Sequence, residues 1–76
     1  MLMVKVFKTD VGGAVEAEKM INVLRKYSFL KINFDLEDED RILRVEGTFF
    51  EVEDIIHCLK KNGHCCVYLP MDFDQW

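Results

Sequence analysis

The chain has 76 residues, with 10 basic and 14 acidic side chains, a net charge of −4 and half of its residues hydrophobic. This length accommodates one hydrophobic core, and the composition excludes an intrinsically disordered chain. Nucleic acid is disfavoured as a partner, because binding to the phosphate backbone depends on clustered Lys and Arg. No apolar run approaches the roughly 20 residues of a membrane span.

The start of the chain has neither the charged leader nor the apolar stretch of a secretory signal. Three cysteines are too few for a disulfide scaffold. Together these features predict a reducing, cytoplasmic setting without a membrane partner. We expect one domain over 1–70, followed by an acidic and aromatic tail over 71–76.

The first third of the chain predicts a strand and a helix. Residues 2–7 are rich in β-forming side chains and predict a strand. A loop with a glycine pair follows over 9–13. Apolar residues at helical spacing over 14–24 then predict a helix that ends near Tyr27–Ser28.

The middle of the chain predicts a β-hairpin. Apolar and polar residues alternate over 31–37, which predicts a strand with one buried and one solvated face. The acidic turn Asp38–Asp40 separates this strand from a return strand over 41–46. In that second strand, Leu43 and Val45 are expected to face inward, and the short connection favours antiparallel pairing.

The last third predicts a second helix and a fourth strand. Thr48-Phe49-Phe50-Glu51 fits a capping box, in which the Thr hydroxyl and the Glu carboxylate satisfy each other's free amides. Gly63 is the expected left-handed terminator of the helix. Residues 65–69 predict a strand, in which we expect Cys65 to face the core and Cys66 to face the open side.

The order of the predicted elements is β-α-β-β-α-β. It predicts an α+β protein with the ferredoxin-like fold, in which two helices pack on one face of a four-stranded antiparallel sheet. Right-handed crossovers place the first and third strands in the centre of the sheet and the other two at its edges.

Four stretches of this chain carry a family resemblance: 4–6 leading into 9–13, 32–36, 43–47 and 55–64. On these residues and this element order, the chain resembles the heavy-metal-associated (HMA) domain family of copper chaperones and metal-ATPase modules, roughly from Val4 to Leu69. The family's most specific motif is Met-x-Cys-x-x-Cys in the first loop, whose two thiolates take a soft ion such as Cu(I). Asp10 and Gly13 stand at the two thiolate positions here. We therefore expect no tight Cu(I) binding and no cofactor.

Asp10 and His64 are the candidate ligands if the chain holds a harder metal. The resemblance implies that His64 lies on a loop close to Asp10, and a His–carboxylate pair is common around metal sites. Two side chains alone make a weak site, because tight zinc sites use three or four protein ligands. The structural alternatives are a helix cap for Asp10 and a solvated loop position for His64.

The sequence does not predict an enzyme. It contains no convergent set of nucleophile, base and carboxylate, and no phosphate-cradling glycine loop. We therefore assign no catalytic residues. Gly12 and Gly13 leave open a small-ligand regulatory domain, because glycines allow a ligand to approach the backbone.

The face of the sheet away from the helices is the predicted contact surface, since exposed apolar patches mark partner surfaces. We expect a small non-catalytic HMA-type module with a degenerate metal site, which acts through protein contacts and self-association. The alternative cover for this face is the tail, with Phe73 and Trp76. Side-chain alternation predicts that the patch consists of Met3, Phe7, Ile42, Cys66 and Tyr68.

Overall fold

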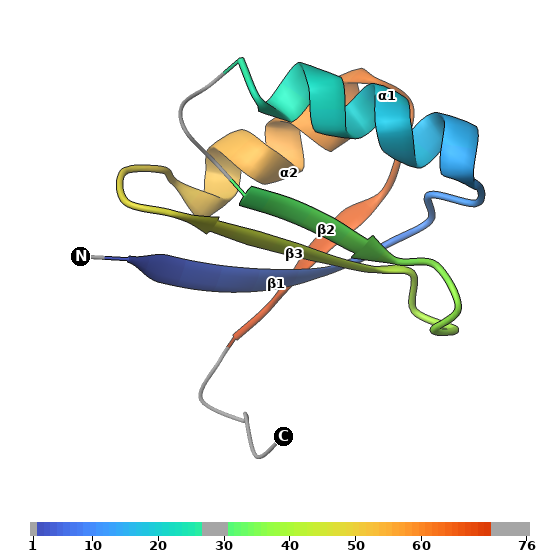
Figure 1. Ribbon diagram of the computed structural model, residues 1–76, viewed down its shortest axis with the longest axis horizontal. Coiled ribbons are helices and arrows are strands. Elements are labelled where there is room, and N and C mark those ends of the chain that lie inside the picture. The colour runs from blue at the N-terminus through green and yellow to red at the C-terminus, as the bar shows by residue number, and fades with distance from the viewer. Residues whose placement is uncertain (1, 27–30, 71–76) are drawn as a thin grey trace.

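The computed structural model describes residues 2–26 and 31–70 (Figure 1). The predicted element order β-α-β-β-α-β is confirmed, and the protein is α+β with a ferredoxin-like arrangement. The predicted tail over 71–76 lies outside the described residues. The elements are β1 (Met3–Thr9), α1 (Ala14–Leu24), β2 (Lys31–Asp35), β3 (Ile42–Gly47), α2 (Val52–Lys61) and β4 (Cys66–Leu69).

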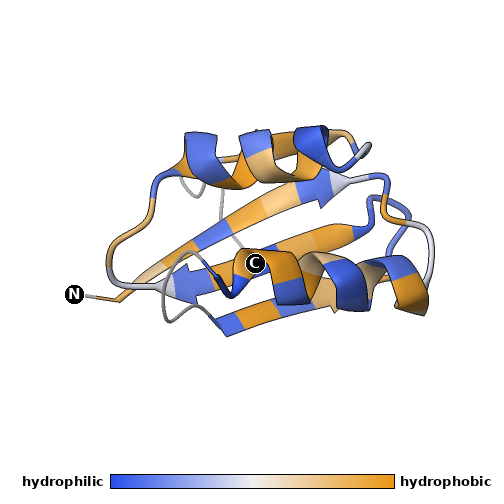
Figure 2. Cartoon of the chain, turned by 90° about the horizontal axis from the view of Figure 1, so that it is seen from above, coloured by the Kyte–Doolittle hydropathy of each residue, from blue (hydrophilic) through white to orange (hydrophobic). Residues whose placement is uncertain are grey.

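The sheet has the strand order β2-β3-β1-β4, and every neighbouring pair is antiparallel. The first and third strands are therefore central, as predicted. Both helices lie on the same face of the sheet (Figure 1). Hydrophilic and hydrophobic bands alternate along the edge strand β2, as expected for a sheet with one face buried under helices, whereas β1 has longer hydrophobic stretches (Figure 2).

The core lies between this face and the two helices. The predicted hairpin is confirmed, because Phe34 pairs with Leu43 and Ile32 pairs with Val45. These four residues contribute to the core or pack against it. Neither of the two helices in the described residues has the length and hydropathy of a membrane span. The buried cluster consists of Phe7, Val11, Ala17, Met20, Leu24, Leu43, Val45, Ile55, Cys58 and Leu59.

The predicted faces of β1 and β4 are wrong. Phe7 pairs with Leu43 on one side and with Tyr68 on the other, and its side chain is fully buried under the helices. Directly paired residues share one face of an antiparallel sheet, so Tyr68 also faces the core. Cys66 has the same orientation, whereas Cys65 is exposed. Both sets of alternate residues in β1 are largely apolar, so the sequence pattern alone does not identify the buried one.

The start of α2 also differs from the prediction. The helix begins at Val52, its N-cap is Glu51, and the cap residue makes no side-chain hydrogen bond. Thr48 lies three residues before this N-cap, so the predicted capping box does not form. The helix α1 ends at Leu24, and its predicted end near Tyr27–Ser28 lies outside the described residues.

The predicted end of α2 is confirmed. Gly63 has a φ of 89°, in the left-handed region that glycine adopts without a steric penalty. Its N–H donates to the carbonyl of Lys60 at 3.0 Å, and the N–H of His64 donates to the carbonyl of Leu59 at 2.9 Å. This pair of hydrogen bonds is a Schellman motif, and it reverses the chain toward β4.

Candidate functional site

Asp10 and His64 meet at the end of the sheet where β1 finishes. The Nδ1 atom of His64 lies 3.3 Å from Oδ1 of Asp10, and the same oxygen accepts the N–H of Cys65 at 3.0 Å. Asp10 directly follows β1, and the glycine terminator of α2 sets the position of His64. The predicted proximity of the two side chains is confirmed, while their role as metal ligands stays a prediction.

Asp10 fastens the first loop to β4 rather than capping a helix. The N-cap of α1 is Gly13, which has an extended φ of −155°, and no side chain caps this helix. The capping role considered for Asp10 is therefore wrong. Burial raises the pKa of the Asp10 carboxyl, but the hydrogen bond from the N–H of Cys65 and the contacts with His64 outweigh burial and hold the pKa below its usual 3.8.

Arg41 links the first loop to the segment after β2 through hydrogen bonds. Its Nη1 donates to the carbonyl of Leu36 at 3.0 Å and to that of Gly12 at 3.4 Å. Its own carbonyl accepts the hydroxyl of Thr9 at 2.7 Å, and that hydroxyl accepts the N–H of Val11 at 3.2 Å. Arg41 has a φ of 47°, which is uncommon for a residue other than glycine. No local sequence pattern indicates this role, because Arg41 is 29 residues from Gly12 in the chain.

The cysteines near this pair do not complete a metal site. Burial, together with the charges of Asp10 and Cys58, raises the pKa of the Cys66 thiol to about 12, so the thiolate is disfavoured at neutral pH. Cys66 faces the core and Cys65 is exposed, so their side chains diverge. In the parts of the chain that the structure describes, no group of three or more His, Cys, Asp or Glu side chains could hold a metal ion.

The five residues of the predicted contact surface do not form one patch on the open face. Phe7 is fully buried, and Cys66 and Tyr68 pack against the core beneath the helices. Met3 has the same orientation as Phe7 in β1. Ile42 is on the opposite face and is 9 % exposed. The physical reason is the register of β1 and β4, which turns their aromatic side chains inward.

The face of the sheet away from the helices has an apolar half and a polar half. The more apolar half runs along β1 and β4, where Val6 is 2 % exposed and pairs with Leu69, while Val67 is 55 % exposed and pairs with Lys8. We call Val4, Val6, Val67 and Leu69 the apolar strip. Because β4 is an edge strand, the strip borders backbone groups that can pair with another strand. The more polar half, on β2 and β3, consists of the apolar Ile42 together with Lys31, Asn33, Asp35, Arg44 and Glu46.

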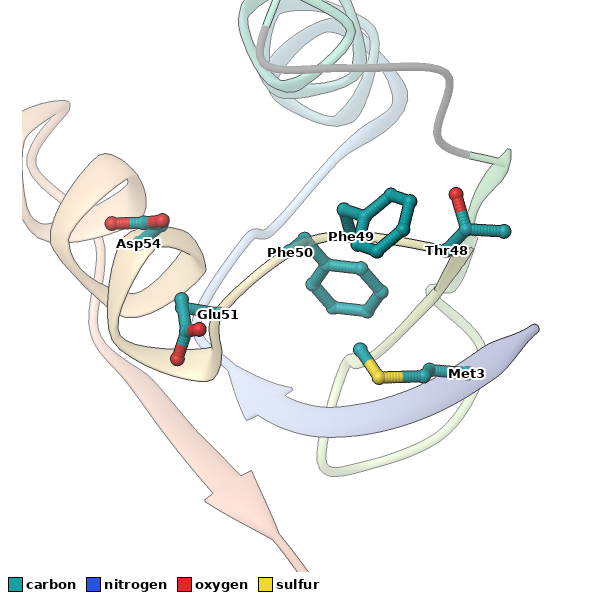
Figure 3. Close-up of a pocket in the computed structure, with 6 residues that line it drawn as sticks. All are labelled: Met3, Thr48, Phe49, Phe50, Glu51 and Asp54. Atoms are coloured by element: carbon teal, nitrogen blue, oxygen red, sulfur yellow. The ribbon is translucent and has the colours of Figure 1, made fainter. Parts of the chain in front are cut away.

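A hollow that the sequence analysis did not predict lies at the opposite end of β1, between the start of this strand and the start of α2 (Figure 3). Its volume is about 340 Å³. Phe49 is 86 % exposed there, although it is a large apolar side chain. The sequence signal for this site is the Phe-Phe pair followed by acidic residues, a pattern that also fits a capping box. We call this site the Phe49 hollow, and it is lined by Met3, Thr48, Phe49, Phe50, Glu51 and Asp54.

Comparisons of the chain with protein-family models, with curated proteins and with solved structures find no match. The resemblance to the HMA family therefore depends on the residues quoted above and on the ferredoxin-like fold.

Proposed function

We propose that the chain is a small, non-catalytic interaction module of the HMA type, which binds a protein partner through the apolar strip. The observation that carries this proposal is the 55 % exposure of Val67 on the edge strand β4, on the same face as the half-buried Leu69. Apolar surface next to an unpaired sheet edge supplies both apolar contact and backbone hydrogen bonds to an added strand.

A second copy of the chain is the first partner to test. Antiparallel pairing of two β4 strands would continue the sheet from one copy into the next and would join the two apolar strips. Val67 would then lie within the interface. A charged residue at this position would be desolvated by pairing, so it should prevent association.

Sedimentation over a range of concentrations tests this proposal. The wild type should self-associate, and Val67→Glu should shift it to the monomer without unfolding it. Asn33→Glu is the matched control, because it adds the same charge to the polar half of this face, on β2 at the other edge. A wild type that stays monomeric while a chain shortened by 71–76 associates would instead identify the tail as the cover of this face.

An atypical metal-binding protein is the second candidate function, because Asp10 and His64 lie 3.3 Å apart. A histidine whose Nδ1 is held by a carboxylate has Nε2 left for a ligand. Calorimetric titration of the wild type and of His64→Ala with Zn²⁺ tests this function. Binding that His64→Ala abolishes would support it, and the absence of binding by the wild type would reject it.

The degenerate-site interpretation predicts that thiolates can be restored in the first loop. A Cβ atom at Gly13 would have only Oε1 of Glu16 within 4 Å, at the ordinary contact distance of 3.6 Å, so a side chain fits. Asp10→Cys combined with Gly13→Cys should therefore bind Cu(I) tightly in competition with a chelator, whereas the wild type should not. No gain in the double variant would contradict the alignment of this loop with the HMA motif.

A cytoplasmic location belongs to the same proposal. Cys58, Cys65 and Cys66 are all described by the structure, and none of them forms a disulfide there. Thiols that are not oxidised to disulfides are typical of proteins in reducing compartments. Accessibility of Cys65 to a thiol reagent in intact cells, compared with lysed cells, would test the location.

A further inference from the structure

The Phe49 hollow combines apolar and acidic side chains. Phe49, Phe50 and Met3 gather above the start of β1, while the carboxylates of Glu51 and Asp54 lie at the start of α2 (Figure 3). Phe50 packs partly against the core, so it forms a fixed wall. Phe49 is 86 % exposed and forms a wall that no other part of the described chain covers.

Neither carboxylate of the hollow forms an ion pair in the described part of the chain. The ion pairs found there join Lys8 to Asp40 and His64 to Asp10, and neither pair involves the hollow. Glu51 is the N-cap of α2 but makes no capping hydrogen bond with its side chain. The hollow is therefore both aromatic and negatively charged.

A neighbouring hollow with aromatic and acidic lining residues contains a lysine side chain of the same chain. It is lined by Met3, Phe50 and Glu51 as well, and it has a volume of about 420 Å³. There the chain supplies its own cation, since Nζ of Lys5 lies 5.7 Å from the centroid of the Tyr68 ring. Such a distance is typical of cation–π attraction. The Phe49 hollow has aromatic rings and carboxylates but lacks an equivalent of Lys5 among its lining residues.

We propose that the Phe49 hollow binds the cationic side chain, Arg or Lys, of a protein segment. The exposed ring of Phe49 would contact the flat or methylene part of that side chain, and the carboxylates of Glu51 and Asp54 would face its charge. The net charge of −4 also favours the approach of a basic partner.

The hollow fits a single long side chain better than a larger ligand. Its volume of about 340 Å³ is near the lower end of the range for small-molecule pockets. A bare metal ion is disfavoured, because Phe49, Phe50 and Met3 offer no oxygen ligands. This inference goes beyond the proposed function and does not depend on it, since the apolar strip lies on the other face of the sheet.

Titration of the isotope-labelled protein with the acetylated peptide Gly-Gly-Arg-Gly-Gly, followed by amide NMR shifts, tests this proposal. The expected result is a saturable change confined to the amides of 3 and 48–54. The same peptide with citrulline in place of Arg keeps the shape but removes the charge. It should bind at least about three-fold more weakly.

Two variants test the two halves of the hollow. Phe49→Ala removes the exposed ring, and Glu51→Gln combined with Asp54→Asn removes both charges. Each should lower the affinity for the Arg peptide by about three-fold or more. The matched controls are Val15→Ala and Glu18→Gln, which make comparable changes at exposed positions of α1 and should leave the affinity unchanged.

Three outcomes would overturn the proposal. The first is equal binding of the Arg and citrulline peptides, and the second is an affinity that neither variant lowers in a protein whose spectrum remains folded. The third is equal affinity for free arginine amide and for the Arg peptide, because the residues beside the Arg would then contribute nothing to the affinity. Weaker peptide binding at about 1 M salt would support the proposal independently of any variant.

Discussion

The two ends of β1 use polar side chains in opposite ways. At its C-terminal end, Arg41 donates hydrogen bonds to the carbonyls of Gly12 and Leu36, and Asp10 contacts His64 and accepts the N–H of Cys65. At its N-terminal end, the side chains of Glu51 and Asp54 lie beside exposed aromatic surface and form no ion pair in the described part of the chain. Polar groups hold the loops together at one end and are left for a ligand at the other.

The polar side chains at the two ends of β1 are therefore expected to have different roles, one in stability and the other in binding. A polar group that is hydrogen-bonded in the folded chain contributes to stability when both partners are present. A carboxylate that faces solvent beside an aromatic ring contributes little to stability and much to the recognition of a cation. Substitutions at the Asp10 end should therefore change the free energy of unfolding, and those at the Phe49 hollow should change binding.

The largest expected effect concerns the core between the two ends. Phe7→Ala should lower the free energy of unfolding by about 3–5 kcal/mol, because the ring is fully buried and its loss leaves a cavity. Met3→Ala is the matched control, on the same face of β1 but at the hollow, and should cost about 1 kcal/mol or less. Urea unfolding measures both values. A loss below about 1 kcal/mol for Phe7→Ala would show that the ring does not face the core.

The next largest effect should appear at Arg41. Arg41→Ala removes two hydrogen bonds of the guanidinium group and keeps a β-carbon at a φ of 47°, so we expect a loss of about 1–3 kcal/mol. Arg41→Gly removes the same hydrogen bonds but relieves the backbone, and it should be about 1 kcal/mol more stable than Arg41→Ala. Thermal unfolding of the two variants measures the difference, and equal stabilities would contradict a strained backbone at this position.

A smaller, pH-dependent effect should appear at Asp10. Its pKa is lower in the folded chain than the usual 3.8, so its contribution to stability is complete above that value and is lost as the pH falls through the folded pKa. Asp10→Asn should remove this contribution and flatten the acid side of the stability profile. The change should stay below about 1 kcal/mol, because Asp10 is 52 % exposed and solvent screens its charge. Unfolding at pH values from about 2 to 6 measures it.

The smallest effect should come from Glu51. Glu51→Gln should change the free energy of unfolding by no more than about 0.5 kcal/mol, because the carboxylate has no partner in the described chain. Chemical denaturation of this variant beside Asp10→Asn compares the two ends directly. A loss above about 1 kcal/mol would show that Glu51 has a structural role and would weaken the contrast between them.

The sequence predicted the element order, the central strands and the hairpin, because these depend on strong local patterns. The alternation around Phe34 and the glycine at position 63 each indicate one local conformation. It did not predict the faces of β1 and β4, because Phe7 and Val6 are both apolar and only the register with β3 shows that Phe7 faces the helices.

The candidate sites were predicted less completely than the fold. The proximity of Asp10 and His64 followed from the family resemblance and is confirmed by their 3.3 Å contact. The role of Arg41 depends on a contact between distant loops, and the Phe49 hollow depends on a helix that begins at Val52 instead of after Thr48. The residues from Thr48 to Glu51 fit a capping box, but this fit does not show where the helix starts. Because α2 starts at Val52, the side chains of these residues do not form the capping box.

The hydrogen bonds that hold the first loop in place leave positions 12 and 13 open to substitution. The groups that hold the loop belong to Thr9, Asp10 and Arg41, and a Cβ atom at Gly12 would meet no atom within 4 Å. Positions 12 and 13 can therefore accept many side chains while the flanking contacts persist. The loop is a natural grafting position, where a library of sequences would present different chemistry on an unchanged scaffold.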